Sequence, residues 1–184
     1  MSKIAIVLHS GYGHTTKVAQ AAAEGSGGAL MAIDAEGNLS AGGQQQLAAA
    51  DAIGMDSPRY RGGRGWQCRK FADASSKAWF AMGWKDKQAA GFTNRAALNG
   101  DKFSTLQSLF TLSQQHGLLR VDRGMQAANA KKSTRDDINN LGGYSGLMTA
   151  TPFDASTDEM GRDDIATAKV LGQRAAADIK RLAK

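Results

Sequence analysis

A glycine-rich segment near the start of the chain has the composition of a phosphate-binding loop. It reads Ser10-Gly11-Tyr12-Gly13-His14-Thr15-Thr16 and stands between a short apolar run and a predicted helix. Unpaired backbone N–H groups at a helix N-terminus, together with the helix dipole, favour an anion at that position. Glycines allow the backbone to close around a phosphate, and hydroxyl groups add donors. The segment is neither a Walker A motif nor G-x-G-x-x-G, and an ordinary tight turn with a threonine cap is the alternative interpretation.

Arginines form the second group of candidate functional residues, because they can bind anionic ligands. Arg59, Arg61 and Arg64 follow Asp56-Ser57-Pro58, and Arg95 and Arg120 come later. Guanidinium groups bind phosphate and carboxylate through paired hydrogen bonds. Because buried unpaired charges are costly, these groups need partners or solvent. The candidate ion pairs are Asp56 with Arg59 or Arg120, and Asp122 with Arg95 or Arg123.

Three histidines and one cysteine complete the candidates. His116 precedes Gly117 at the end of a predicted helix. It could pass a proton or a hydrogen bond to a substrate, or it could simply interact with the helix dipole. His9, His14 and His116 are too widely spaced to predict a metal site. Cys68 alone excludes an internal disulfide and a CxxC motif.

Alternating strands and helices position these residues. The apolar run at 4–8 is typical of a strand buried on both faces. Further strands are predicted at 29–34, 50–57 and 87–93, with a fifth that begins at 118–121 and continues at 146–150. Helices are predicted at 16–24, 66–79 and 102–115, the last with Phe103, Leu106 and Phe110 inward. An apolar stripe from Ile165 to Leu182 predicts a terminal helix. This order predicts a parallel α/β sheet.

Composition restricts the class of protein further. The 184 residues suit one domain, and a net charge of +6 with 42% hydrophobic residues predicts a folded chain. No apolar run approaches the roughly 20 residues of a membrane span, and no signal-peptide pattern is present. The expected compartment is therefore the cytoplasm. No nucleic-acid-reading motif accompanies the basic residues.

The order and spacing of several sequence blocks resemble the flavodoxin-like NAD(P)H:quinone oxidoreductases of the WrbA type, and the broader NADPH-dependent FMN reductases. The resemblance extends over nearly the whole chain. It rests on the glycine-rich segment and on five further blocks, which are Ser57-Pro58-Arg59-Tyr60-Arg61-Gly62-Gly63, Lys70-Phe71-Ala72-Asp73, Lys87-Gln88-Ala89-Ala90-Gly91-Phe92-Thr93, Gln115-His116-Gly117 and Gly142-Gly143-Tyr144-Ser145-Gly146. It implies one flavodoxin-like domain over 1–184. The implied fold is a doubly wound, five-stranded parallel sheet of order 2-1-3-4-5 in three α/β/α layers, with the ligand at the carboxyl ends of the strands.

The resemblance also implies a function and its residues. The protein would be an FMN-dependent enzyme that passes a hydride from NAD(P)H to a quinone, with His116 as the catalytic residue. It would act as a homodimer or homotetramer. The implied cofactor-binding residues are Ser10, Gly11, Tyr12, Gly13, His14, Thr15, Pro58, Arg59, Tyr60, Arg61, Gly62, Gly63, Thr93, Asn94, Arg95 and His116.

Some positions depart from the pattern of that family. Asp56 stands where a glycine ends the third strand, Arg59 replaces a threonine, and Arg95 and Arg120 replace small or apolar residues. Three interpretations follow. In the first, the changes are neutral drift at the rim of the pocket. In the second, the protein binds FMN and the arginines attract an anionic dinucleotide or an acidic quinone. In the third, the flavin site is altered or lost and the scaffold binds another anionic ligand without redox turnover.

Overall fold

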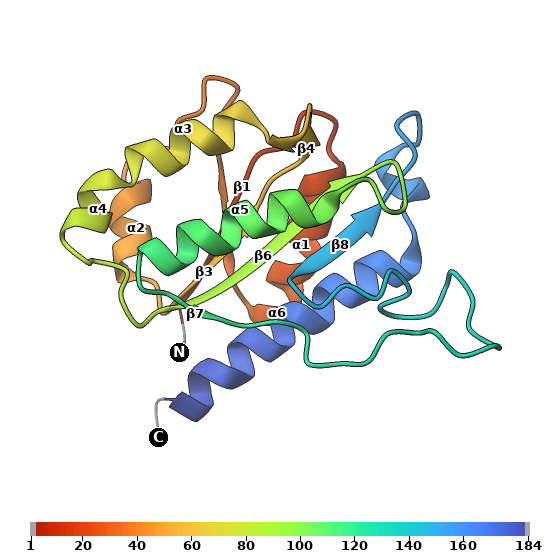
Figure 1. Ribbon diagram of the computed structural model, residues 1–184. Helices are drawn as coiled ribbons and strands as arrows, with labels where there is room; N and C mark the ends of the chain where they lie inside the picture. The colour runs from red at the N-terminus through yellow and green to blue at the C-terminus, as the bar shows by residue number, and fades with distance from the viewer. Residues whose placement is uncertain (1–2, 183–184) are drawn as a thin grey trace.

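The computed structural model describes residues 3–182, which form a parallel sheet covered by helices on both faces (Figure 1). The strands of the sheet are β1 (Ile4–Leu8), β2 (Ala29–Ala32), β3 (Ala52–Asp56), β6 (Gln88–Arg95), β7 (Leu119–Arg120) and β8 (Leu147–Ala150). Their order is β2-β1-β3-β6-β7, and β8 also pairs with β6. Since β7 and β8 are two parts of the fifth strand, the predicted flavodoxin-like order 2-1-3-4-5 is confirmed.

The residues of the first strand show why the fold has three layers, with the sheet between two layers of helices. All five residues of β1 are buried. Because side chains alternate along a strand, Ala5 and Val7 join one apolar cluster while Ile4, Ile6 and Leu8 join another. The first cluster lies under α2 (Gly43–Ala49), α3 (Trp66–Ala74) and α5 (Lys102–Gln115). The second lies under α1 (His14–Ser26) and α6 (Arg162–Leu182). A strand with a core on each side needs the continuous apolar run that the sequence has.

Helices α1 and α6 approach each other through glycines. A β carbon at Gly25 would meet the carbonyl oxygen of Lys169, and one at Gly172 would meet that of Ala22. The predicted stripe of α6 is confirmed at its centre, where Ala168, Gly172 and Ala175 are buried. The small side chains therefore set the distance between the two helices that lie against one face of the sheet.

The fifth strand is interrupted in its middle. β7 pairs with Gln88 and Ala89, and β8 pairs with the residues from Phe92 to Arg95. The chain between them, 121–146, leaves the sheet as a long loop that extends away from the other elements (Figure 1). The guanidinium of Arg120 lies beside Gly91 and donates to the carbonyl oxygen of Ser145 at 3.1 Å. Arg120 therefore occupies the gap between the two halves of the strand.

Two helix predictions need correction. The segment predicted as one helix at 66–79 is divided at Ser75 into α3 and α4 (Ser76–Phe80). Helix α5 has the predicted bounds, and Leu106 is buried, but Phe103 and Phe110 are exposed. The helix is rotated so that Leu109 and Leu112 join Leu106 in the core. Phe110 instead packs near the Arg120 guanidinium, 5.8 Å from its ring centroid.

Two small elements lie beside the carboxyl ends of the strands. A hairpin of β4 (Arg59–Tyr60) and β5 (Gly63–Arg64) follows β3. A single turn of 3-10 helix, η1 (Thr157–Glu159), lies between β8 and α6. No helix within residues 3–182 is both long enough and apolar enough to cross a membrane.

Candidate functional site

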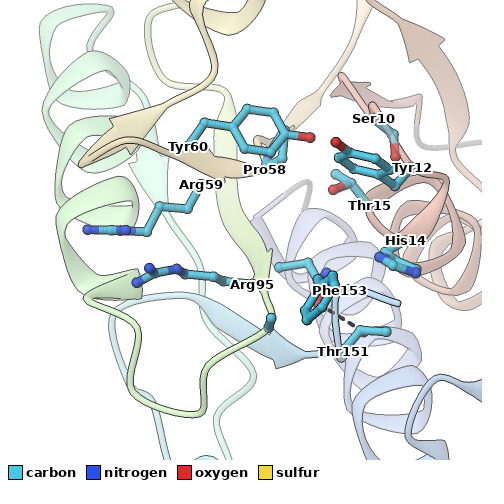
Figure 2. Close-up of a pocket in the computed structure, with 12 residues that line it drawn as sticks. Ser10, Tyr12, His14, Thr15, Pro58, Arg59, Tyr60, Arg95, Thr151 and Phe153 are labelled. Carbon is cyan, nitrogen blue, oxygen red and sulfur yellow. Dashed lines mark hydrogen bonds between the residues drawn. The ribbon is translucent and has the colours of Figure 1, made fainter. Parts of the chain in front are cut away.

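A cavity of about 270 Å³ opens at the carboxyl ends of the strands (Figure 2). Four segments form its wall: the loop after β1, the loop and hairpin after β3, the end of β6, and the loop after β8. The residues that line it are Ser10, Tyr12, His14, Thr15, Pro58, Arg59, Tyr60, Asn94, Arg95, Ala96, Thr151 and Phe153. Open parallel sheets place ligands at this edge, so the cavity is the candidate site.

The loop after β1 presents free hydrogen-bond donors. Gly13 has φ 89°, in the left-handed region, and its N–H donates to the Ser10 hydroxyl oxygen at 2.9 Å. Among the residues that the structure describes, the backbone N–H groups of His14, Thr15 and Thr16 have no hydrogen-bond acceptor. These are the first three amides of α1, where the positive end of the helix dipole lies. The loop can therefore bind an anion.

Aromatic side chains surround the opening. Tyr12, Phe153 and Tyr60 are all exposed, by 76%, 83% and 39% respectively. Figure 2 shows all three rings around the cavity. The Tyr60 hydroxyl lies against the backbone of Gly11, where a β carbon would come within 2.8 Å of it, and burial raises the pKa of Tyr60. Exposed rings around a hollow suit a flat aromatic ligand.

Asn94 has a fixed orientation at the inner wall of the cavity. Its side-chain oxygen accepts hydrogen bonds from the Thr149 hydroxyl at 2.8 Å and from the Thr151 hydroxyl at 3.2 Å. An amide has one oxygen and one NH2 group. Because both hydroxyls occupy the oxygen, the NH2 group is the part of Asn94 left to serve a ligand.

The charges at the rim are paired differently from the sequence expectation. Arg59 contacts the Asp101 carboxylate at 3.4 Å, and Arg95 contacts the same carboxylate at 3.9 Å. Asp122 pairs with Arg123 at 3.0 Å, which was one of the two partners predicted for it from the sequence. The pairings of Asp122 with Arg95, and of Asp56 with an arginine, are wrong. Asp101 accounts for the difference, because it precedes α5 and so lies at the same edge of the sheet as both arginines.

Asp56 is buried without a partner. Neither carboxylate oxygen has a hydrogen bond among the described residues, and the residue is 3% exposed. Burial raises the pKa of this carboxyl well above its ordinary value, since a charged carboxylate loses its hydration there. Asp56 is not a wall residue of the cavity; it lies beneath, at the end of β3.

Seven predicted site residues lie outside the cavity wall. Thr93 is fully buried and donates to the carbonyl oxygen of Ser57 at 2.7 Å, so it ties two of the loops together. Arg61, Gly62 and Gly63 line a neighbouring groove on the outer side of the hairpin. His116 lies elsewhere. Gly11 and Gly13 contribute backbone to the first loop without lining the wall.

His116 lies at the opposite end of the sheet from the cavity. Helix α5 begins at the carboxyl edge, beside Arg59, and runs back along the sheet, so the residue that follows it lies at the amino edge. Its ring is 1% exposed, stacks on Trp84 with centroids 4.1 Å apart, and has Nε2 2.9 Å from the Ser75 hydroxyl oxygen. Burial lowers the pKa of His116. Within one chain, this histidine is a packed residue and does not face the cavity.

Three wall residues were missed from the sequence: Ala96, Thr151 and Phe153. Thr151 and Phe153 follow β8 directly. The rule that ligands bind beyond the carboxyl ends of parallel strands would have included them. They were missed because the long loop between the two halves of the fifth strand makes the end of that strand difficult to locate from the sequence.

The chain matches known proteins along nearly its full length, although no protein-family model matches it. It is 46% identical to flavodoxin FldP of Pseudomonas aeruginosa, over 96% of each protein. It is 28% identical to an NAD(P)H dehydrogenase (quinone) of Trichlorobacter lovleyi, over 99% of each.

The solved structures agree with these relatives. The WrbA-like flavodoxin of Agrobacterium tumefaciens superposes with a TM-score of 0.82 at 45% identity, over 98% of this chain and 99% of that one. A Fusobacterium nucleatum flavodoxin bound to flavin mononucleotide superposes with a TM-score of 0.61 at 14% identity, over 99% of each chain, which shows the common fold. The fold, the cavity at the carboxyl edge and these identities lead to one conclusion: the chain belongs to the flavodoxin-like, WrbA-like family.

Proposed function

We propose that the protein binds FMN in the cavity at the carboxyl edge and passes a hydride from NAD(P)H to a quinone. The observation that carries the proposal is the meeting of two features in one cavity. These are a loop with free amides at the start of α1 and an opening surrounded by three aromatic rings.

The residues present fit the two ends of the cofactor. The phosphate would be held by the amides of His14, Thr15 and Thr16, with the Thr15 hydroxyl beside them. The flat ring would lie among Tyr60, Tyr12 and Phe153. The Asn94 NH2 group, fixed by two threonines, would donate to a ring acceptor. FMN, when bound, supplies the redox chemistry, and these side chains hold and orient it.

The exposed side chains at the rim of the cavity support contact between a bound flavin and a second molecule, the nicotinamide or the quinone. Tyr12 and Phe153 are open to solvent, so one face of a bound ring would remain accessible to nicotinamide and to quinone in turn. This arrangement predicts ping-pong kinetics. Because His116 is remote, a proton for the quinone would come from solvent or from a group at the rim.

The first experiment is a titration of the purified protein with FMN, followed by visible absorption. We expect one FMN per chain. NAD(P)H oxidation is then measured with a quinone acceptor. Saturating FMN without any bound flavin would refute the proposal, whereas bound flavin without NAD(P)H oxidation would refute only the reductase activity.

A second candidate is a flavin-containing electron carrier. The 46% identity to a protein named flavodoxin favours it over the 28% identity to the named quinone dehydrogenase. A carrier would be reduced by a separate reductase and not by NAD(P)H directly. Anaerobic mixing of the FMN-loaded protein with NADPH therefore discriminates: bleaching of the flavin band supports the enzyme, and a stable band supports the carrier.

The remaining candidate is an anion-binding protein without redox turnover. Arg59 and Arg95 at the rim favour it. Phosphate compounds other than FMN would then raise the melting temperature of the protein while FMN does not, because only a bound ligand stabilises the folded state.

Self-association is part of the proposal. The outer face of α5 exposes Phe103 and Phe110, and Tyr144 is exposed beside them. These apolar groups would favour a homodimer or homotetramer. Light scattering that reports a monomer over a wide concentration range would exclude it.

A further inference from the structure

A second hollow lies on the outer side of the β4–β5 hairpin, next to the cavity. It has a volume of about 560 Å³ and is lined by Arg61, Arg64, Arg69 and Trp66, with Ser108 of α5 opposite. Tyr60 lines both hollows. Figure 2 shows Tyr60 on the hairpin, with its ring at the cavity. A long ligand could therefore occupy both hollows at once.

The three arginines of this groove form no salt bridge with any residue that the structure describes. Within residues 3–182, no carboxylate lies within 4.0 Å of the guanidinium of Arg61, Arg64 or Arg69, and none of the three donates a side-chain hydrogen bond. One guanidinium nitrogen of Arg64 is buried without a partner. Like charges around one hollow repel each other, and a bound anion would relieve that repulsion.

The hairpin brings two of these charges together. Arg59 is paired directly with Arg64 across the two strands, and like charges in such a position are destabilising. Arg59 has Asp101 as its partner, whereas Arg64 faces the groove. The two paired arginines of the hairpin therefore differ: Arg59 forms a salt bridge at the cavity, whereas Arg64 lies beside Arg61 without one.

The turn of the hairpin makes the position of Arg61 unusual. Arg61 and Gly62 have φ of 43° and 94°. A two-residue turn with positive φ at both positions favours asparagine, aspartate or glycine at the first of them. The backbone of an arginine at this position is strained, and the strain does not stabilise the hairpin. We therefore attribute the presence of arginine at position 61 to contact between its side chain and a ligand.

We propose that this groove binds the adenosine end of NADPH, with the 2′-phosphate and the pyrophosphate on the arginines and the adenine ring on Trp66. Trp66 is 57% exposed, as a stacking surface requires. Guanidinium groups hold phosphates by paired hydrogen bonds. The nicotinamide would then reach past Tyr60 to the cavity. The inference rests on the proposed function, in which NAD(P)H is the reductant, and it adds a preference for NADPH over NADH.

The test compares binding of 2′,5′-ADP and 5′-AMP, by calorimetry, to the protein saturated with FMN, so that the phosphate loop after β1 is occupied. This readout does not depend on turnover. We expect 2′,5′-ADP to bind about tenfold or more tightly than 5′-AMP, because the additional phosphate makes at least one additional charge-assisted contact. Equal affinities would overturn the inference.

Arg61→Asn is the sharpest variant. Asparagine suits the positive φ, so the variant should fold at least as well as the parent. We expect affinity for 2′,5′-ADP to fall about tenfold and the KM for NADPH to rise by a similar factor. Arg181→Gln is the matched control, since it removes one exposed arginine near the end of α6.

The outcomes separate this inference from the proposed function. If neither dinucleotide reduces the FMN-loaded protein but Arg61→Asn still weakens 2′,5′-ADP, the reductase activity fails and the anion site stands. If turnover is normal and Arg61→Asn and Arg69→Gln leave 2′,5′-ADP and the KM for NADPH unchanged, the inference is wrong. Weakened binding of an acidic protein by these variants, with 2′,5′-ADP unaffected, would also overturn it and assign the groove to a protein partner.

Discussion

The ring of His14 lies 2.7 Å from the carbonyl oxygen of Ala155, 141 residues later in the chain. Since a carbonyl only accepts, Nε2 of His14 carries the hydrogen and donates it. A salt bridge between Lys17 and Asp158 at 3.6 Å joins the same two segments. The loop that carries Phe153 is therefore fastened to the first turn of α1, beside the amides proposed to bind phosphate.

Replacing His14 by alanine would loosen the Phe153 loop. We expect FMN affinity to fall about two- to tenfold, the value of one neutral hydrogen bond. Riboflavin, which lacks the phosphate, should lose affinity by the same factor, because the loop contacts the ring. His14→Gln keeps a side-chain donor and should restore part of the affinity. A fluorescence titration with both flavins measures this. A loss confined to FMN would mean that His14 contacts the phosphate itself.

Gly13→Val tests the phosphate loop. The glycine has φ 89°, and a β carbon would lie 2.9 Å from the Thr157 methyl group, so the loop must shift. Losing one or two charge-assisted hydrogen bonds should weaken FMN about ten- to a thousandfold. Riboflavin affinity should change much less, which distinguishes a local effect from unfolding. Unchanged FMN affinity in a folded variant would show that the loop is only a turn.

Asp56 should make stability depend on pH. Its pKa is raised in the folded protein, so the folded state keeps a proton that the unfolded chain releases above the ordinary value of 3.8. Stability is therefore greatest below that value and falls as pH rises, by at most about 1.4 kcal/mol per pH unit. Asp56→Asn removes the titration. Urea unfolding from about pH 4 to about pH 8 should give a flatter profile for the variant. Identical slopes would show that Asp56 finds a partner.

Gly172→Ala tests the contact between α1 and α6. The new methyl group would meet the carbonyl oxygen of Ala22, so the helices must separate. We expect a loss of about 1–3 kcal/mol in the free energy of unfolding. Gly83→Ala is the control: its β carbon would have no heavy atom nearer than 3.6 Å, and its effect should lie within about 0.5 kcal/mol. Equal effects of the two substitutions would contradict the packing argument.

Much of the fold was predictable because its causes are local in the chain. A continuous apolar run such as 4–8 is typical of a strand with a core on each side, and Gly117 ends α5 where a left-handed residue is needed. Repeated strand–helix units then restrict the topology to a parallel, doubly wound sheet. The position of the loop from Ser10 to Thr15, between a strand and a helix, was also predictable, because the apolar run before it and the helix after it are local features of the chain.

Other features depend on neighbours that are remote in sequence. Arg59 and Arg95 pair with Asp101 only because three loops meet at one edge of the sheet. The buried face of α5 was predicted one step around the helix from its true position, since both the stripe with Phe103 and the stripe with Leu109 are apolar. The direction of that helix carries His116 to the far end of the sheet. Residue spacing along the chain fixes which elements form, but which side chains meet is decided by how those elements pack.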